Sequence, residues 1–294
     1  MNLGFVFGLA AAFFFASTSI LVRIGQRSRP TDDGMFMTVF VNVLVLGTVA
    51  ALAEWPAWDT ASVGAFVIGG VIGTVGGRTA LLRGVRLIGP SRSNAFLAGA
   101  PVVAAVAGWL ALGETVEPIE MLGGLLAIFG LLWLIGARSS GVGPDHTAVP
   151  LRSYIIAAGA PISFGLAFVF RKWGLDRFPS SVVGAFIGVA AAFTVILLIE
   201  AARKSLAGRA HSNFTNVSWW FVAGGATTSL ALLSQFQAFT YLEAWVVGIL
   251  QGTQAIWSIP LSLLFLKGDE RIDIPLVGSV LLVVAGVTLI SLQA

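Results

Sequence analysis

Long apolar runs, each separated from the next by a short polar or glycine- and proline-containing stretch, dominate the pattern of this chain. Ten runs approach the length of about 20 residues that a helix needs to cross a bilayer. We expect helices at about Leu3–Ile24, Gly34–Ala53, Ala61–Arg86, Ser91–Leu112, Val116–Ile135, Tyr154–Lys172, Ser180–Leu198, Trp219–Tyr241, Ala244–Leu266 and Ile274–Ser291. The pattern predicts an all-α integral membrane protein with ten transmembrane helices.

The composition supports this interpretation and argues against a soluble protein. Hydrophobic residues make up 57% and charged residues 11% of the 294 positions, against roughly 25% charged residues in soluble domains. The net charge of +3 does not indicate a nucleic-acid partner, because the basic residues stand at the ends of apolar runs, where they anchor helices in a lipid bilayer. The chain has no cysteine, which removes disulfides and thiolate chemistry.

A weak internal repeat links the two halves of the chain. At an offset of 155 residues, Gly69-Gly70 falls on Gly224-Gly225, and at an offset of 149 residues, Arg23 falls on Lys172. The matches keep the same order across five helices. We therefore expect a first five-helix repeat at residues 1–136 and a second at residues 154–294.

Residues 137–153, which combine Gly, Pro, Ser and charged residues, are expected to form a linker between the repeats. Because five is an odd number, the two repeats must sit in the membrane in opposite orientations. Inverted repeats of this kind are typical of alternating-access transporters.

Gly69, Gly73 and Gly77 recur every four residues and therefore share one face of the third predicted helix. Small residues at this spacing allow a second helix to approach closely in lipid. A phosphate-binding loop would need a preceding strand, which this pattern does not predict. The stripe therefore indicates helix packing.

The most characteristic stretch runs from Ala80 to Leu134 and contains Pro101, the corner Leu112-Gly113-Glu114 and a glycine-bearing helix with Gly123. On these residues the chain resembles the drug/metabolite transporter superfamily, specifically its ten-helix EamA-type members, and the resemblance covers essentially the whole chain.

The second half departs from the superfamily pattern. Its proline, Pro260, stands one turn after the matched position, and Lys267-Gly268-Asp269 replaces the Leu-Gly-Glu corner. The resemblance implies a central cavity lined mainly by the first, third, fourth, sixth, eighth and ninth helices, with the fifth and tenth helices at the periphery. It implies a small-molecule substrate and does not specify which one.

The basic residues also predict an orientation. Of the 17 Lys and Arg residues, 13 fall in the connections after the first, third, fifth, seventh and ninth helices. The positive-inside rule makes that side cytoplasmic, so both termini of this cell-membrane protein would lie outside. Members of the resembled superfamily usually have both termini inside, so the two arguments conflict.

Arg78 is the one charged residue that these boundaries place well inside an apolar run. A charge at membrane depth is by default a candidate functional group, so Arg78 is a candidate anchor for an anion or carboxylate. The alternative is an arginine that snorkels toward Arg83 and Arg86 at the basic side. Ser17 in the first helix and Asn94 at the polar start of the fourth are further candidate substrate-binding residues.

The eighth and ninth helices carry further candidates. Gln235, Gln237, Gln251 and Gln254 offer amide donors and acceptors to a polar metabolite, or hold helices together. Trp257 lies near the middle of its helix, where it stacks on a substrate or fills the core. The three prolines Pro101, Pro161 and Pro260 are expected to kink their helices.

The chemistry that the sequence lacks narrows the function. No Asp or Glu falls in the middle of a predicted helix, and His146 and His211 lie in connections. We therefore expect no catalytic residues, metal ligands or cofactor, and no proton-coupled export of cations. The sequence predicts a multi-pass transporter of a small polar or amphipathic metabolite, such as an exporter of amino-acid-like compounds working by alternating access; the alternative is a non-transporting membrane scaffold or sensor subunit.

Overall fold

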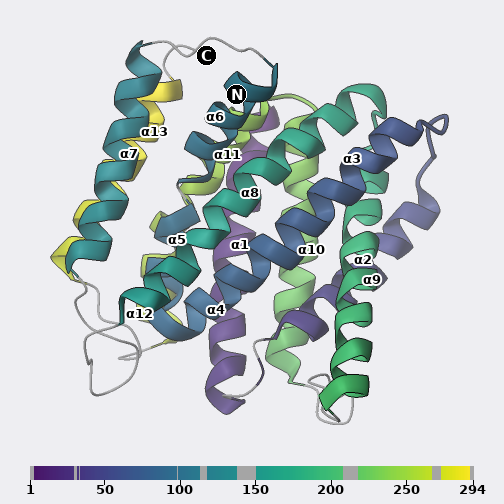
Figure 1. Cartoon of the computed structure of the whole chain (residues 1–294), viewed down its shortest axis with the longest axis horizontal. Helices are drawn as coiled ribbons and strands as arrows, with labels where there is room; N and C mark the ends of the chain where they lie inside the picture. Colours follow the sequence, from purple (N-terminus) through teal and green to yellow (C-terminus); the bar gives the residue numbers. More distant parts are fainter. Residues whose placement is uncertain are drawn as a thin grey trace.

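The computed structural model describes residues 3–29, 32, 34–97, 99–112, 118–137, 150–207, 218–266 and 273–291. Every regular element in these residues is a helix, which confirms the predicted all-α class (Figure 1). The elements are α1 (Leu3–Ser28), α2 (Met35–Leu52), α3 (Thr60–Gly70), the π-helix η1 (Val71–Arg78), α4 (Thr79–Ile88), α5 (Pro90–Leu97), α6 (Ala100–Leu112), α7 (Pro118–Ala137), α8 (Leu151–Arg177), α9 (Ser181–Ala207), α10 (Trp219–Phe239), α11 (Ala244–Gly252), α12 (Gln254–Phe265) and α13 (Ile274–Ser291).

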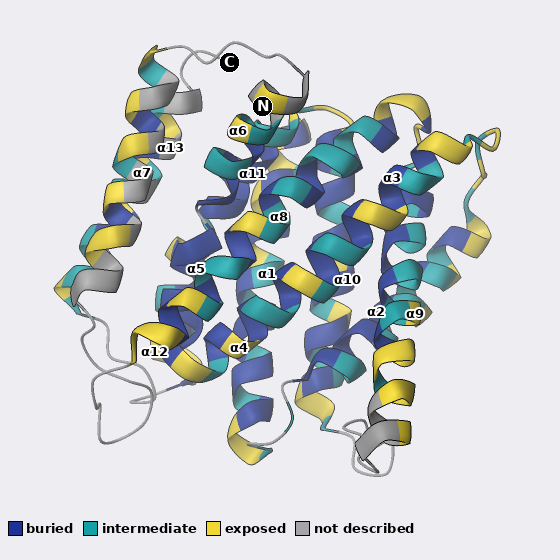
Figure 2. Cartoon of the chain, viewed as in Figure 1, coloured by how far each residue is buried: buried dark blue, intermediate teal, exposed yellow. Residues whose placement is uncertain are grey.

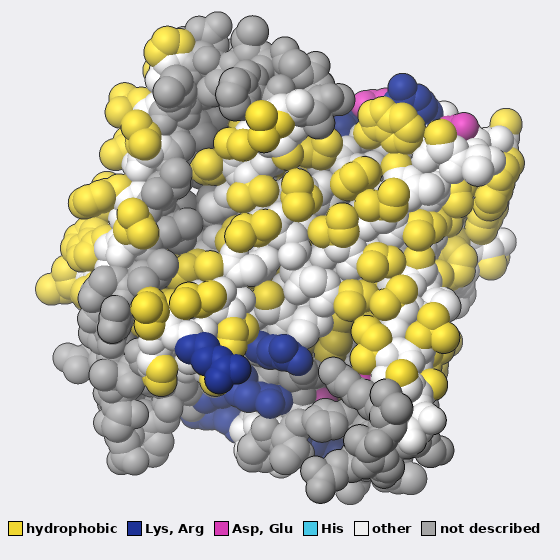
Figure 3. Space-filling model, in the orientation of Figure 1, with side chains coloured by type: hydrophobic (Ala, Val, Ile, Leu, Met, Phe, Trp, Pro, Cys, Tyr) yellow, Lys and Arg dark blue, Asp and Glu magenta, His cyan; other side chains and the backbone are white. Residues whose placement is uncertain are grey.

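Within the described ranges, six helical stretches are long and apolar enough to cross a membrane by themselves. They are Leu3–Ser28, Met35–Leu52, Thr60–Ile88, Leu151–Arg177, Ser181–Ala202 and Ala244–Phe265. Apolar side chains also cover much of the visible outer face, with Lys and Arg side chains gathered beside the end of α4 (Figure 3). The chain is therefore a multi-pass membrane protein.

Several helices run further than the sequence predicted. The first continues to Ser28, the sixth spans Leu151–Arg177, and the seventh extends through part of the expected polar segment to Ala207. Arg, Lys and Gln have high intrinsic helix propensity, so the first charged residue does not end a helix. The last three residues of the predicted linker therefore belong to α8.

The predicted third helix is continuous from Thr60 to Ile88 but changes to π geometry through η1. Its glycine stripe packs closely against another helix, as expected, and that helix is α8. A Cβ added at Gly73 would lie 3.0 Å from the Cβ of Ala167, and one added at Gly77 would lie 3.1 Å from the Phe164 ring. The stripe thus brings the backbone of η1 against a helix of the other half.

The fourth and ninth predicted helices are each interrupted. The first of them breaks after Leu97, where α5 ends, and the second breaks after Gly252, where α11 ends. These two residues match at the offset of 155. Pro101 occupies the first turn of α6, where its missing N–H and fixed φ are tolerated, whereas Pro161 and Pro260 lie inside the uninterrupted segments α8 and α12.

Contacts between the two halves are reciprocal. The ring of Phe221 in α10 fills the space beside Gly25 of α1, and the ring of Phe66 in α3 fills the space beside Gly174 of α8. Phe66 and Phe221 match at the offset of 155, and the two glycines match at 149. The contacts therefore repeat with the roles of the halves exchanged.

The helices α1 and α8 run in opposite directions. Near the end of α1, Gln26 Nε2 donates to the carbonyl oxygen of Leu82 at 3.2 Å. Near the start of α8, Ala157 lies against Gly84 of the same helix, α4. The end of α1 and the start of α8 therefore lie at the same end of the bundle (Figure 1).

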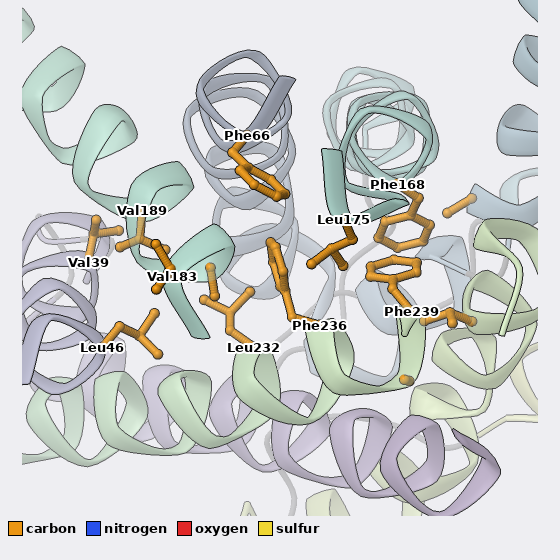
Figure 4. Packing of buried hydrophobic residues seen from close by; sticks show 14 of the residues in the cluster. Val39, Leu46, Phe66, Phe168, Leu175, Val183, Val189, Leu232, Phe236 and Phe239 are labelled. Carbon is orange, nitrogen blue, oxygen red and sulfur yellow. The ribbon is translucent and has the colours of Figure 1, made fainter. Parts of the chain in front are cut away.

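Both halves contribute to one core, and burial is concentrated inside the bundle (Figure 2). Its buried side chains include Val39, Leu46, Phe66, Phe168, Leu175, Val183, Val189, Leu232, Phe236 and Phe239 (Figure 4). The helices α7 and α13 pack side by side at one edge, in the peripheral position that the resemblance implied (Figure 1). The cavities inside the bundle are lined by residues of α1, η1, α4 to α6, α8 and α10 to α12.

Candidate functional site

A cavity with an empty volume of about 470 Å³ lies between α1, η1, α4, α8 and α10. We refer to it as the arginine cavity. It is lined by Phe15, Thr18, Ser19, Gly73, Thr74, Arg78, Leu81, Leu82, Phe164, Arg171, Thr228 and Leu232. Both halves of the chain therefore supply its walls, and each half supplies one arginine.

Arg78, predicted from the sequence, is buried and lines this cavity. Its Nη2 donates to Thr228 Oγ1 at 2.9 Å. The Asn42 amide satisfies all its neighbours in only one orientation, in which its nitrogen donates to Ser229 Oγ and to two backbone oxygens while its oxygen accepts from Arg78 Nη1 at 2.9 Å. Arg78 therefore faces into the bundle and is held by two neutral groups.

Arg171 is the principal residue that the sequence analysis missed as a site residue. It was expected near the end of the sixth helix, but α8 continues past it and its side chain is only 4% exposed. Its Nη1 donates to Gln235 Oε1 at 2.8 Å, and its guanidinium carbon lies 5.5 Å from the Phe236 ring centroid. The signal in the sequence was the apolar Leu175 and Phe178, which continue one helical face beyond it.

Hydroxyl groups connect the arginine cavity to its surroundings. Thr18 Oγ1 lies 2.8 Å from Thr227 Oγ1 and 3.1 Å from Thr228 Oγ1, so α1 and α10 share a hydrogen-bonded network. Ser17, the residue named from the sequence, bonds the carbonyl oxygen of Phe13 at 2.9 Å and lines neither cavity. Its neighbours Thr18 and Ser19 occupy the cavity wall instead.

Asn94 is fully buried but lies behind the cavity wall. It accepts a hydrogen bond from Ser19 Oγ at 3.1 Å and donates from Nδ2 to Ser258 Oγ at 2.6 Å. It therefore links α1, α5 and α12 and positions Ser19.

A second cavity, with an empty volume of about 320 Å³, adjoins the first. We refer to it as the glutamine cavity. It is lined by Phe15, Leu81, Leu97, Ala100, Phe164, Phe168, Gln235, Gln251 and Gln254. Phe15, Leu81 and Phe164 line both cavities, so the two spaces adjoin at these three apolar side chains.

Gln251 and Gln254, two of the predicted residues, hydrogen-bond to each other in the glutamine cavity. Gln254 Nε2 donates to Gln251 Oε1 at 2.6 Å. This bond leaves Gln251 Nε2 as a buried donor and Gln254 Oε1 as a buried acceptor without protein partners. The pair therefore presents one free donor and one free acceptor.

The structure places two other predicted residues away from the cavities. Gln237 accepts a hydrogen bond from Ser181 Oγ of α9 at 2.8 Å. Trp257 is 39% exposed and packs edge-on against Phe13, with ring centroids 5.4 Å apart. Trp257 therefore lies on the outer surface of α12, which neither of the two sequence interpretations expected.

The lining residues of both cavities include two arginines and no acidic side chain. In the described part of the chain, no group of three His, Cys, Asp or Glu residues is placed to bind a metal ion. The Gly113-Glu114 corner, His146, His211 and the Lys267-Gly268-Asp269 corner lie outside the described residues. The described site is therefore cationic and rich in hydrogen-bonding groups.

Comparisons with known proteins bear on the family and the fold of the chain. The chain matches a protein family described as the EamA-like transporter family over residues 2–136 and again over residues 151–292. A solved structure titled "Crystal structure of protein" is similar in fold, with a TM-score of 0.64 at 16% sequence identity over 100% of this chain and 97% of that chain. No curated protein matches the sequence.

Proposed function

The chain belongs to the EamA-like transporter family, and we propose that it moves a small polar or amphipathic metabolite through its two adjoining cavities by alternating access. The observation that carries the proposal is the buried polar lining at the interface of the two halves. Polar and charged side chains are costly inside a membrane protein and are retained where they serve a pathway or a binding site.

The proposed architecture is ten transmembrane helices arranged as two inverted five-helix repeats, residues 1–136 and 154–294, joined by the linker. Three features support it: the opposite directions of α1 and α8, the exchanged contacts of Phe66 and Phe221, and the helix breaks at matched positions. Interrupted helices near a central site are typical of inverted-repeat transporters. In this mechanism the halves rock against each other and expose the cavities to each side in turn.

Cysteine accessibility tests alternating access directly, because the natural chain has no cysteine. We expect Ser19→Cys, in the arginine cavity, to react with a membrane-impermeant thiol reagent from either side of a proteoliposome. Ser17→Cys is the matched control, because its side chain lies outside both cavities, and it should stay unlabelled. Labelling of Ser19→Cys from one side only, under all conditions, would argue against alternating access.

The same proteoliposomes separate a transporter from a scaffold or sensor subunit. Export of amino-acid-like metabolites is the first substrate class to test by counterflow of labelled compounds. If the chain is a transporter, the double variant Gln254→Leu and Arg78→Ala should show a lower rate of counterflow, because both residues line the cavities. Unchanged flux in this double variant would favour a non-transporting role for the polar lining.

The proposed orientation puts both termini of this cell-membrane protein outside, by the distribution of its basic residues. A fluorescent reporter that matures only in the cytoplasm, fused after Ala294, should therefore stay dark. A bright fusion would reverse the proposed orientation.

A further inference from the structure

We propose that the arginine cavity binds the carboxylate of an organic anion, while Gln251 and Gln254 bind an uncharged hydrogen-bonding group at the other end of the same molecule. The inference concerns the substrate class of the cavities and rests on the proposed transport function for its physiological meaning.

The first step is the charge of the arginine cavity. Arg78 and Arg171 are 7% and 4% exposed, and arginine stays protonated in proteins. Among the described residues, both donate hydrogen bonds to neutral side chains: Arg78 to Thr228 and Asn42, and Arg171 to Gln235. Buried charges are normally paired with an opposite charge. Because the described lining residues include no carboxylate, an anionic ligand can supply the opposite charge.

The second step is the geometry around Arg171. Its buried Nε has no hydrogen-bond partner among the described residues, so the guanidinium keeps a donor for a ligand. Gly73 leaves room for this group, because a Cβ at that position would lie 2.7 Å from Arg171 Nη2. Guanidinium groups bind carboxylates through two parallel hydrogen bonds. The pair of arginines, one from each half, therefore offers a carboxylate a site that spans the interface of the halves.

The third step is the opposite end of the ligand. Gln251 Nε2 and Gln254 Oε1 are a buried free donor and a buried free acceptor, which is the complement of a primary amide or a hydroxyl group. Phe15, Leu81 and Phe164 line both cavities, so the body of a molecule that reaches from the arginines to the glutamines would lie against these apolar side chains. The linings of the two cavities therefore complement a carboxylate, a short apolar body and a neutral polar end.

This arrangement discriminates by charge. An ammonium group would be buried beside two arginines, and the described lining residues offer it no carboxylate. Like charges in a low-dielectric interior repel strongly. We therefore infer that net-anionic acids are preferred over amines and over zwitterions of the same size, which narrows the amino-acid-like class of the proposed function to its anionic members.

The test compares ligands that differ only in charge. Succinate, glutarate and adipate, each with its monoamide and diamide, are added to the purified full-length protein, and thermal unfolding is followed. A ligand that binds the folded state raises its apparent stability. At least one monoamide or diacid should raise the Tm, whereas the neutral diamides should not. Protection by a diamide equal to that by its acid, or no protection by any acid, would overturn the inference.

Variants show whether the arginines bind the ligand or only support the fold. Arg78→Gln and Arg171→Gln should each weaken binding of the protective acid about tenfold or more, since a hydrogen bond to a charged group contributes about 1.5–3 kcal/mol. The Tm without ligand should not fall, because an unpaired buried charge is removed. Gln254→Leu should weaken binding of the monoamide. Gln237→Leu should leave this binding unchanged, because Gln237 lies outside the cavities. Unchanged affinity in the arginine variants would overturn the assignment.

Counterflow in proteoliposomes distinguishes this inference from the proposed function. If the acids bind but no compound is exchanged, the transport proposal fails and the carboxylate site stands. If neutral amides are exchanged and the acids are not, transport stands and the carboxylate site fails.

Discussion

Two kinds of buried arginine occur in this molecule, and they differ in what neutralises them. Arg92 in α5 is 1% exposed and forms an ion pair with Asp273, with Nη2 and Oδ2 2.7 Å apart. Asp273 also caps α13, accepting from the backbone N–H of Leu276 at 3.0 Å. The arginines of the cavity, Arg78 and Arg171, donate to neutral side chains among the described residues.

The difference separates structure from function. A buried charge that has its counter-ion within the chain joins two helices permanently. A buried charge without a counter-ion in the chain can be neutralised by an anionic ligand that binds and later dissociates. Burial alone therefore does not distinguish the proposed binding arginines from Arg92; among the described residues, the lack of a carboxylate partner does.

The largest expected effect comes from breaking the internal pair. Asp273→Asn removes the carboxylate of this ion pair while Arg92 stays buried and charged, and removing one partner of a buried pair costs about 3–5 kcal/mol. Unfolding of the purified variant, followed by heat or denaturant, should show this loss. Adding Arg92→Met to the same variant should restore part of the stability. If Asp273→Asn alone is as stable as the natural chain, the carboxylate partner of Arg92 does not stabilise the fold, and the contrast with Arg78 and Arg171 fails.

Converting the cavity arginine into an internally paired one tests the comparison from the other side. Thr74 lines the arginine cavity four residues before Arg78, so Thr74→Glu places a carboxylate near the guanidinium. We expect a higher Tm without ligand than in the isosteric Thr74→Gln control, and a loss of carboxylate binding of about tenfold or more. Retained binding in Thr74→Glu would show that the ligand does not use this charge.

A smaller effect is expected from crowding Arg171. Gly73→Ala adds a methyl group against its Nη2 and against Ala167, and overpacking costs about 1–3 kcal/mol. Carboxylate affinity should fall together with stability. Gly64→Ala is the control in the same continuous helix, because a Cβ there would meet nothing within 4 Å. It should be neutral or slightly stabilising, and equal losses in both variants would point to a general effect of helix composition.

The smallest effect concerns a charge that faces water. Hydrogen bonds from the Ser62 side chain and backbone lower the pKa of Asp59, the cap of α3. Because the folded pKa is below the unfolded value of about 4, the stabilisation is present above that pH and is lost as the pH falls through the folded pKa. The Tm difference between the natural chain and Asp59→Asn should shrink on acidification. If the Tm difference does not change with pH, the charge of the Asp59 cap does not contribute to stability.

Part of the site was predictable because it follows from local rules. A charge within an apolar run identified Arg78, and polar side chains on successive helices identified Gln235, Gln251 and Gln254. The side of a helix on which a polar residue lies was not predictable. Ser17 and Ser19 are two positions apart in the first helix, yet only Ser19 lines the arginine cavity. In a membrane helix the outer face meets lipid and the inner face meets other apolar helices, so hydrophobic periodicity is a weak guide to which side faces inward.

The sequence by itself determined the helical membrane class and the family, because backbone polar groups in lipid have to be satisfied within each helix and apolar run lengths reveal this directly. It also contained the two-copy pattern whose contacts the structure makes reciprocal. Only the tertiary structure decided that Arg171 joins Arg78 in one cavity while Arg92 is neutralised by Asp273. Arg78 and Arg171 belong to different halves of the chain. Their placement in one cavity depends on small residues such as Gly73, which let helices that are distant in the sequence approach each other.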